Sequence, residues 1–213
     1  MKKQILTAAS ILLVSATLFT TGCKKDNADT VNPTVTPNGG STTYVEKGKL
    51  YQEPGAAATD DVDGTLTASP SGSVNTAVVG SYIITYTATD AAGNKGTATR
   101  TVNVVEFDGA YNYSEVCDQS GSATGTPTVI ASSASANNGM SISNFALAGS
   151  TVIAQATFSG TSITIPSFTS GGETFVGSGT ISGGVGSAVK MTINYTQTNS
   201  SGTNTCSCTY THQ

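Results

Sequence analysis

The sequence GSYIITYTATD at residues 80–90 decides the fold of the first half of the chain. Its even-numbered residues from Tyr82 to Ala88 are apolar or aromatic and share one face of an extended strand. Residues 91–96 supply turn chemistry, and residues 97–105 form a second alternating run. The pattern predicts an antiparallel hairpin with one face buried and one face toward solvent.

The composition extends this prediction to the whole chain. Only 10% of the residues are charged, whereas Thr, Ser and Gly are abundant and are accompanied by Val, Ile and Tyr. These residues are typical of strands joined by tight turns. Beyond the N-terminal segment, no stretch longer than about two turns has helical periodicity. We therefore predict an all-β protein.

The charge balance excludes some partners. Nine Lys and Arg residues face 13 Asp and Glu residues, so the formal net charge is −4. Nucleic acid and anionic lipid surfaces both require a basic face, which an acidic chain lacks. We predict no nucleic-acid partner.

The first 23 residues have the pattern of a secretory signal, with a basic start and an apolar run over 5–18 that is too short to span a bilayer. The run leads to Gly22-Cys23, and this segment resembles a bacterial lipoprotein signal, with Thr20 where Leu is usual. The resemblance implies removal of residues 1–22, lipidation of Cys23 with palmitate-type chains, and attachment to the outer membrane. Either the cell surface or the periplasmic face is possible.

Residues 23–43 are rich in Asn, Thr, Pro and Gly and contain almost no large apolar residues. Such a segment cannot bury enough surface to offset its ordering entropy. We predict a flexible tether with a reach of about 25 Å. The charged residues directly after Cys23 resemble the surface-export signals of Bacteroidetes lipoproteins, and a solvated spacer is the alternative.

Further motifs surround the predicted hairpin. They are GAAATDDVDG at 55–64, AGN at 92–94 and TRTV at 99–102. Together with residues 80–90 they resemble a bacterial immunoglobulin-like (Ig-like) domain of the kind found in surface proteins. The resemblance implies a seven-strand Greek-key sandwich over residues 44–105, with Tyr82 at the tyrosine corner. This domain has no cysteine pair and no Trp, so apolar packing must hold its sheets together.

Four aspartates in this domain form a candidate calcium site. Asp60, Asp61 and Asp63 lie in one turn and Asp90 lies in another, and carboxylate oxygens at this spacing could surround Ca²⁺. The pattern lacks the bidentate Glu of a complete calcium loop. The alternative is that these side chains cap the turns through neighbouring backbone groups.

Residues 106–213 form a second predicted domain of eight short strands separated by turn signals. The predicted strands are 108–117, 126–134, 138–145, 150–158, 161–167, 173–182, 187–198 and 203–212. Eight consecutive strands favour a meander closed into an up-and-down barrel, because closure removes the exposed edges. The layout weakly resembles lipocalin-like barrels, which can be filled or hollow. An open sandwich is the alternative.

Three cysteines belong to this domain. Cys117 ends the first predicted strand, and Cys206 and Cys208 lie in the last, which is its neighbour in a closed meander of even strand number. Cys117 could therefore form a disulfide with either of them, leaving one thiol unpaired. One alternative is a metal site, for which His212 would be the fourth ligand, and the other is that all three thiols are free and buried.

No catalytic motif or cofactor motif stands out, so we predict a non-catalytic protein without a cofactor or a catalytic metal. The leading hypothesis is a lipid-anchored protein in which the Ig-like domain is a spacer. The second domain would then be a head that binds a glycan, a protein or a small ligand. The alternatives are an assembly component of an outer-membrane complex and a lipocalin-like carrier of a small apolar ligand.

Overall fold

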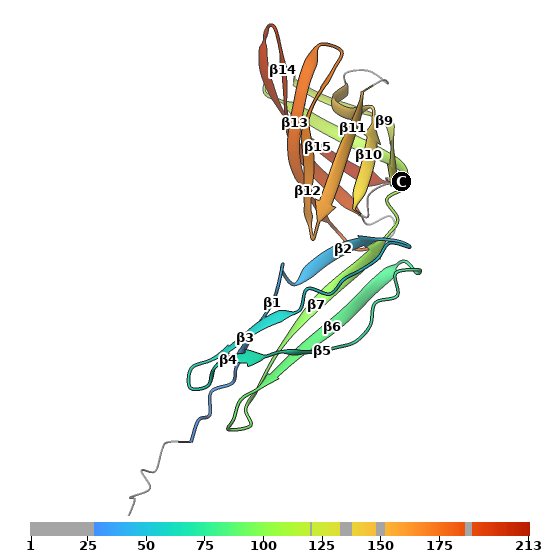
Figure 1. Ribbon diagram of the computed structural model, residues 1–213. Coiled ribbons are helices and arrows are strands. Elements are labelled where there is room, and N and C mark those ends of the chain that lie inside the picture. Colours follow the sequence, from blue (N-terminus) through green and yellow to red (C-terminus); the bar gives the residue numbers. More distant parts are fainter. Residues whose placement is uncertain (1–27, 120, 133–137, 148–151, 186–188) are drawn as a thin grey trace, which may run out of the picture.

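The computed structural model describes residues 28–119, 121–132, 138–147, 152–185 and 189–213. The signal segment, Cys23 and the first part of the predicted tether lie outside these residues. The described chain forms two β-domains arranged end to end, with an Ig-like sandwich below and a barrel above in Figure 1.

The first domain contains seven strands in two sheets, which confirms the predicted Ig-like sandwich. One sheet has the order β1-β3-β4, with bounds Thr34–Pro37, Ala56–Asp60 and Gly64–Thr67. The other has the order β2-β7-β6-β5, with bounds Thr42–Glu46, Lys95–Val105, Gly80–Thr89 and Ser69–Ser71. The predicted hairpin is the antiparallel pair β6–β7, and β2 adds to it in parallel.

The tyrosine corner forms as the resemblance implied. The Tyr82 hydroxyl donates to the Val78 carbonyl oxygen at 2.9 Å. This bond ties the start of β6 to the loop before it, which is the role of this motif in sandwich domains.

The tether predicted for residues 23–43 is too long, and the Ig-like domain begins before residue 44. Thr34–Pro37 pairs with β3, and Pro33 passes so close over β7 that a Cβ on Gly96 would lie 1.8 Å from the Pro33 carbonyl oxygen. The prediction failed because it counted apolar side chains. This segment is held by backbone pairing, by close contact with a glycine and by the single side chain of Val35, which packs against the core of the sandwich.

The solvent-facing side predicted for the hairpin is also wrong at one end. Asn103 and Val105 are buried, although they share the face predicted to be wet. Asn103 accepts a hydrogen bond from Ser81 at 2.6 Å, and Val105 belongs to the apolar core of the second domain. For Val105 the covering comes from the neighbouring domain, which local alternation does not encode.

The second domain is a closed barrel whose strands follow chain order, so the predicted eight-stranded meander is confirmed and the open-sandwich alternative is wrong. Each strand is antiparallel to the next, and β15 pairs with β8 to close the barrel. The strands are β8 Gly109–Cys117, β9 Gly121–Ser132, β10 Gly139–Ser143, β11 Ile153–Ser159, β12 Ser162–Ser170, β13 Glu173–Ser182, β14 Lys190–Asn199 and β15 Gly202–His212, with a 3₁₀ turn at Phe145–Leu147.

Large side chains occupy the barrel interior among the described residues. The Phe145 ring lies 4.8 Å from Tyr195 and 6.1 Å from Phe175, measured between ring centroids. Tyr111 and Tyr210 are likewise buried. Small residues on β13 serve close strand packing, because a Cβ on Gly179 would lie 2.3 Å from the Thr192 carbonyl oxygen. This packing disfavours the carrier alternative.

The two domains are joined through a shared core. Tyr44 of β2 and Val105 and Phe107 of the connection belong to the same apolar cluster as the barrel interior. The Tyr44 hydroxyl donates to the Gly183 carbonyl at 2.7 Å, and its backbone N–H donates to the Gly160 carbonyl at 3.2 Å. Within the described residues, no helix has the length and apolar character needed to cross a membrane.

Candidate functional site

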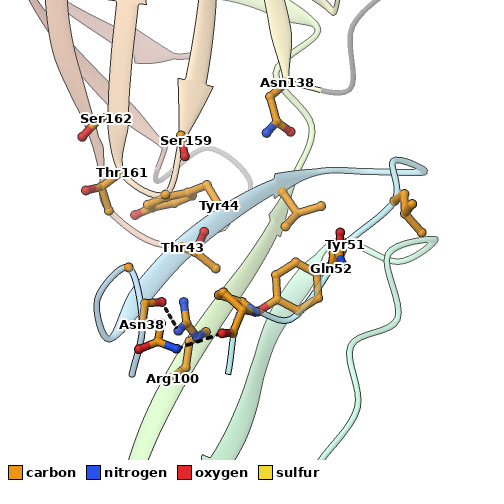
Figure 2. A pocket seen from close by; sticks show the side chains of 15 residues that line it. Asn38, Thr43, Tyr44, Tyr51, Gln52, Arg100, Asn138, Ser159, Thr161 and Ser162 are labelled. Atoms are coloured by element: carbon orange, nitrogen blue, oxygen red, sulfur yellow. Dashed lines mark hydrogen bonds between the residues drawn. The ribbon is translucent and has the colours of Figure 1, made fainter. Parts of the chain in front are cut away.

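A groove of about 670 Å³ lies where the barrel meets the Ig-like domain. Figure 2 shows its two walls: Ser159, Thr161, Ser162 and Asn138 come from the barrel, and β2 with the Asn38 and Tyr51 segments comes from the Ig-like domain. Beside the groove, Tyr44 of β2 contacts the barrel end through its hydrogen bonds with Gly183 and Gly160. Sequence reasoning did not find this site, since its walls come from segments far apart in the chain.

Arg100 lies at the bottom of the groove and is only 2% exposed. Its position on β7 places it on the same face as Val102, so strand alternation turns it inward. Its Nε donates to the Tyr86 hydroxyl at 2.9 Å, and its Nη2 donates to the carbonyl oxygens of Asn38 and Gly55. The guanidinium therefore links the two sheets of the sandwich.

Glu53 balances this buried charge. Its Oε1 lies 3.4 Å from Arg100 Nε and accepts hydrogen bonds from the Tyr86 hydroxyl and the Gly55 N–H, while its Oε2 accepts from the Tyr51 hydroxyl. Desolvation raises the pKa of Glu53, but these hydrogen bonds and the Arg100 charge outweigh it, so the pKa is lowered. The carboxylate is thus held in its charged form beside the guanidinium.

The predicted calcium residues gather at the opposite end of the Ig-like domain. Carboxylate oxygens of Asp63 and Asp90 lie within 4.8 Å of one another and of Asp29, and a second group joins Asp29 to Asp60 and Asp61. Asp29 was assigned to the tether in the sequence prediction. The Asn94 side chain brings it here by donating to the Asp29 carbonyl oxygen at 3.2 Å. We call these five aspartates the acidic pole.

Several carboxylate oxygens of the acidic pole accept hydrogen bonds from backbone N–H groups of the turns, as the capping alternative predicted. Asp60 Oδ1 accepts from the N–H groups of Val62 and Asp63 at 3.0 Å each, and Asp63 Oδ2 accepts from Ala91 N–H at 2.6 Å. However, the Oδ2 atoms of Asp29 and Asp60 are shielded from solvent without a hydrogen-bond partner among the described residues. Turn capping alone leaves these two oxygens unexplained.

Two of the three barrel cysteines form a disulfide, and the third is a free thiol. Cys117 and Cys206 lie opposite each other in the β8–β15 register and form a disulfide, and Cys208 is free and buried. Burial raises the pKa of the Cys208 thiol to about 12, so the group is unreactive at neutral pH. The disulfide uses two of the thiols that a metal site would need. His212 instead packs edge-to-face on Tyr111.

A buried carboxyl lies beside this disulfide. Glu115 faces the barrel interior, where its Oε1 accepts a hydrogen bond from the Tyr195 hydroxyl. Desolvation raises the pKa of Glu115, and the Tyr195 hydrogen bond only partly opposes this. The fold therefore favours the protonated carboxyl.

This raised pKa predicts that the barrel loses stability as pH rises. A group whose pKa is higher in the folded state stabilises the fold fully below its unfolded pKa, about 4.3 for Glu, and this contribution is lost as pH rises through the folded pKa. In Glu115→Gln the decline should be absent, so the variant should be more stable than the wild type at neutral pH. Urea unfolding from pH 4 to pH 8 measures this, and parallel curves for the two proteins would contradict it.

The comparisons with known proteins concern the Ig-like domain most directly. Residues 35–104 match the family described as bacterial surface protein, Ig-like domain, which confirms the resemblance seen in the sequence. No curated protein matches the chain. A solved lipoprotein structure from Bacteroides thetaiotaomicron is 17% identical over 85% of this chain and 100% of that one, with a TM-score of 0.33. A bacterial surface domain fits a non-catalytic protein of the cell envelope.

Proposed function

We propose that the protein is a lipid-anchored, non-catalytic component of the outer membrane in which the Ig-like domain is a rigid spacer for the barrel. The lipoprotein-type signal ending at Cys23 supports the anchor. The main support for the spacer role is the junction at Tyr44, where two hydrogen bonds and a shared apolar core join the two domains.

The direction of the chain agrees with this role. Asp29 lies at the acidic pole, and the barrel is attached at the other end of the long strands β6 and β7 (Figure 1). A lipid at Cys23 would therefore hold the acidic pole near the membrane and the barrel away from it. Several acyl chains on one cysteine make such an anchor stable.

The anchor is tested by expression in a bacterium that processes lipoproteins. Wild-type protein should be found in the membrane fraction, and its barrel should be accessible to antibody on intact cells if it faces outward. The Cys23→Ala variant should be released into the soluble fraction with its fold unchanged. Equal membrane association of the two proteins would contradict the anchor, and antibody access only after permeabilisation would assign the protein to the periplasmic face.

The spacer predicts that loss of the Tyr44 ring uncouples the domains. Tyr44→Ala should give the sandwich and the barrel different rotational correlation times in ¹⁵N relaxation, whereas the wild type should tumble as one body. Tyr44→Phe is the matched control. It keeps the buried ring and loses one hydrogen bond worth about 1 kcal/mol, so the coupling should persist. Two independent domains in the wild type would exclude a rigid spacer.

We further propose that the acidic pole binds Ca²⁺, which would fix the Asp29 segment to the domain at the membrane-proximal end. The support is the pair of shielded, unpartnered oxygens on Asp29 and Asp60, because Ca²⁺ is coordinated by carboxylate oxygens.

Titration calorimetry should detect Ca²⁺ binding to the wild type, and Asp29→Asn/Asp60→Asn should weaken it about tenfold or more, since both lose ligand charge. Glu106→Gln, a change to an exposed acid at the other end of the domain, should leave binding unchanged. The absence of binding heat at millimolar Ca²⁺ would contradict the proposed calcium site.

A further inference from the structure

The groove at the domain junction has the surface chemistry of a site for hydroxyl-rich ligands. Most of its lining side chains carry hydroxyl or amide groups, and these are Asn38, Thr43, Tyr44, Tyr51, Gln52, Asn138, Ser159, Thr161 and Ser162. No hydrogen bond among the described residues uses the side chains of Gln52, Asn138 or Ser162. Hydroxyls and amides both donate and accept, which matches the mixed donors and acceptors of sugar hydroxyl groups.

The charge of the groove points to a neutral ligand. Of the described residues that line the groove, Arg100 is the one with a charged side chain, and Glu53 already lies 3.4 Å from its Nε. An anion would therefore meet a pair whose charges largely cancel, in a protein whose net charge is −4. No hydrogen bond among the described residues uses Arg100 Nη1, so its N–H groups remain for a neutral acceptor at the bottom of the groove.

The size and apolar parts of the groove suit a short chain segment. Its volume of about 670 Å³ falls within the roughly 300–1,000 Å³ range of small-molecule sites. The Tyr51 ring and Leu50, which is 77% exposed, lie on the Ig-like wall. They offer apolar surface for the C–H face of a sugar ring, while the barrel wall offers hydroxyls (Figure 2).

We propose that this groove binds a short segment of a neutral carbohydrate chain. The inference rests on the proposed function, since it assigns the ligand recognition of a surface-anchored protein to the junction rather than to the barrel interior. Contacts from both walls would make binding depend on the fixed arrangement of the two domains.

The test uses the purified chain lacking only the segment through Cys23, with cellohexaose, xylohexaose, mannohexaose and maltohexaose as neutral probes and oligogalacturonate as a charged probe. ¹⁵N chemical-shift titration should show saturable shifts in segments 38–54 and 159–162 with at least one neutral probe. Thr161→Trp, which fills the groove, should abolish these shifts. Ser201→Trp, at a hairpin tip outside the groove, should leave them intact.

The double variant Gln52→Ala/Asn138→Ala removes one exposed amide from each wall and should weaken binding about tenfold, because two hydrogen bonds are lost. Gln155→Ala, on the outer face of the barrel, is the matched control and should bind as the wild type does.

The absence of shifts with all neutral probes at millimolar concentration would overturn the proposal, as would binding of oligogalacturonate alone or binding that survives Thr161→Trp. Because this test needs no lipid, its failure would leave the anchor and the spacer standing. A failure of the Cys23→Ala experiment would likewise leave the groove untouched.

Discussion

Removal of the Cys117–Cys206 disulfide is expected to lower the free energy of unfolding of the barrel by about 4–5 kcal/mol in the chain-entropy model. The two cysteines are 89 residues apart, so the crosslink closes almost the entire barrel into one loop. In the reduced chain the unfolded barrel regains the entropy of that loop. The folded barrel retains its strand pairing, because β8 and β15 also share a continuous ladder.

The measurement is urea unfolding of the chain lacking Cys23, oxidised and reduced, together with Cys117→Ala/Cys206→Ala. Cys208→Ala is the control, since it removes a buried thiol and leaves the crosslink. Thiol counting under denaturing, non-reducing conditions should find one free thiol in the chain that lacks only Cys23, and three after reduction. Three free thiols without reduction would show that the disulfide is absent.

Replacement of Arg100 by Met is expected to destabilise the Ig-like domain by about 3–5 kcal/mol. The change leaves the Glu53 carboxylate without its cation, and the carbonyl oxygens of Asn38 and Gly55 without their shared donor. Among the described residues, the buried apolar cluster at the centre of this domain is small and consists of Val45, Ile84, Tyr86 and Val102. We therefore expect the sandwich to unfold at a much lower urea concentration than in the wild type.

Lys95→Ala at the exposed start of the same strand is the matched control and should change stability little. The double variant Arg100→Met/Glu53→Gln tests whether the unpaired Glu53 charge causes the destabilisation. It removes both charges and should recover part of the stability lost in Arg100→Met. A cost below about 1 kcal/mol for Arg100→Met would contradict a structural role for the ion pair.

The burial of Arg100 could have been predicted from the sequence. Arg100 is two residues before Val102, so the alternation that placed Val102 in the core also placed Arg100 there. The signal was available, but a charged residue is rarely fully buried. The partners that permit its burial come from 38 to 86, and no local pattern brings them together.

The acidic pole shows the same division. Asp60, Asp61, Asp63 and Asp90 were found from the sequence, because turn motifs fix where loop carboxylates lie relative to their strands. Asp29 was missed, since the segment that carries it is ordered by pairing of β1 with β3 and by contact with β7. Most of these contacts involve backbone groups, including the Asp29 carbonyl oxygen that accepts from the Asn94 side chain, and composition does not report them.

Alternation and turn residues, which act between neighbours in the chain, were enough to predict the all-β class, the hairpin at 80–105 and the eight-stranded meander. The Ig-like domain followed from the resemblance of its motifs to a known family. The choice of Cys206 over Cys208 as the partner of Cys117 depends on the β8–β15 register, which sets the residues that lie opposite each other across the closed barrel. Only the tertiary structure decided the junction at Tyr44 and the groove beside it, since both arise where segments distant in sequence meet.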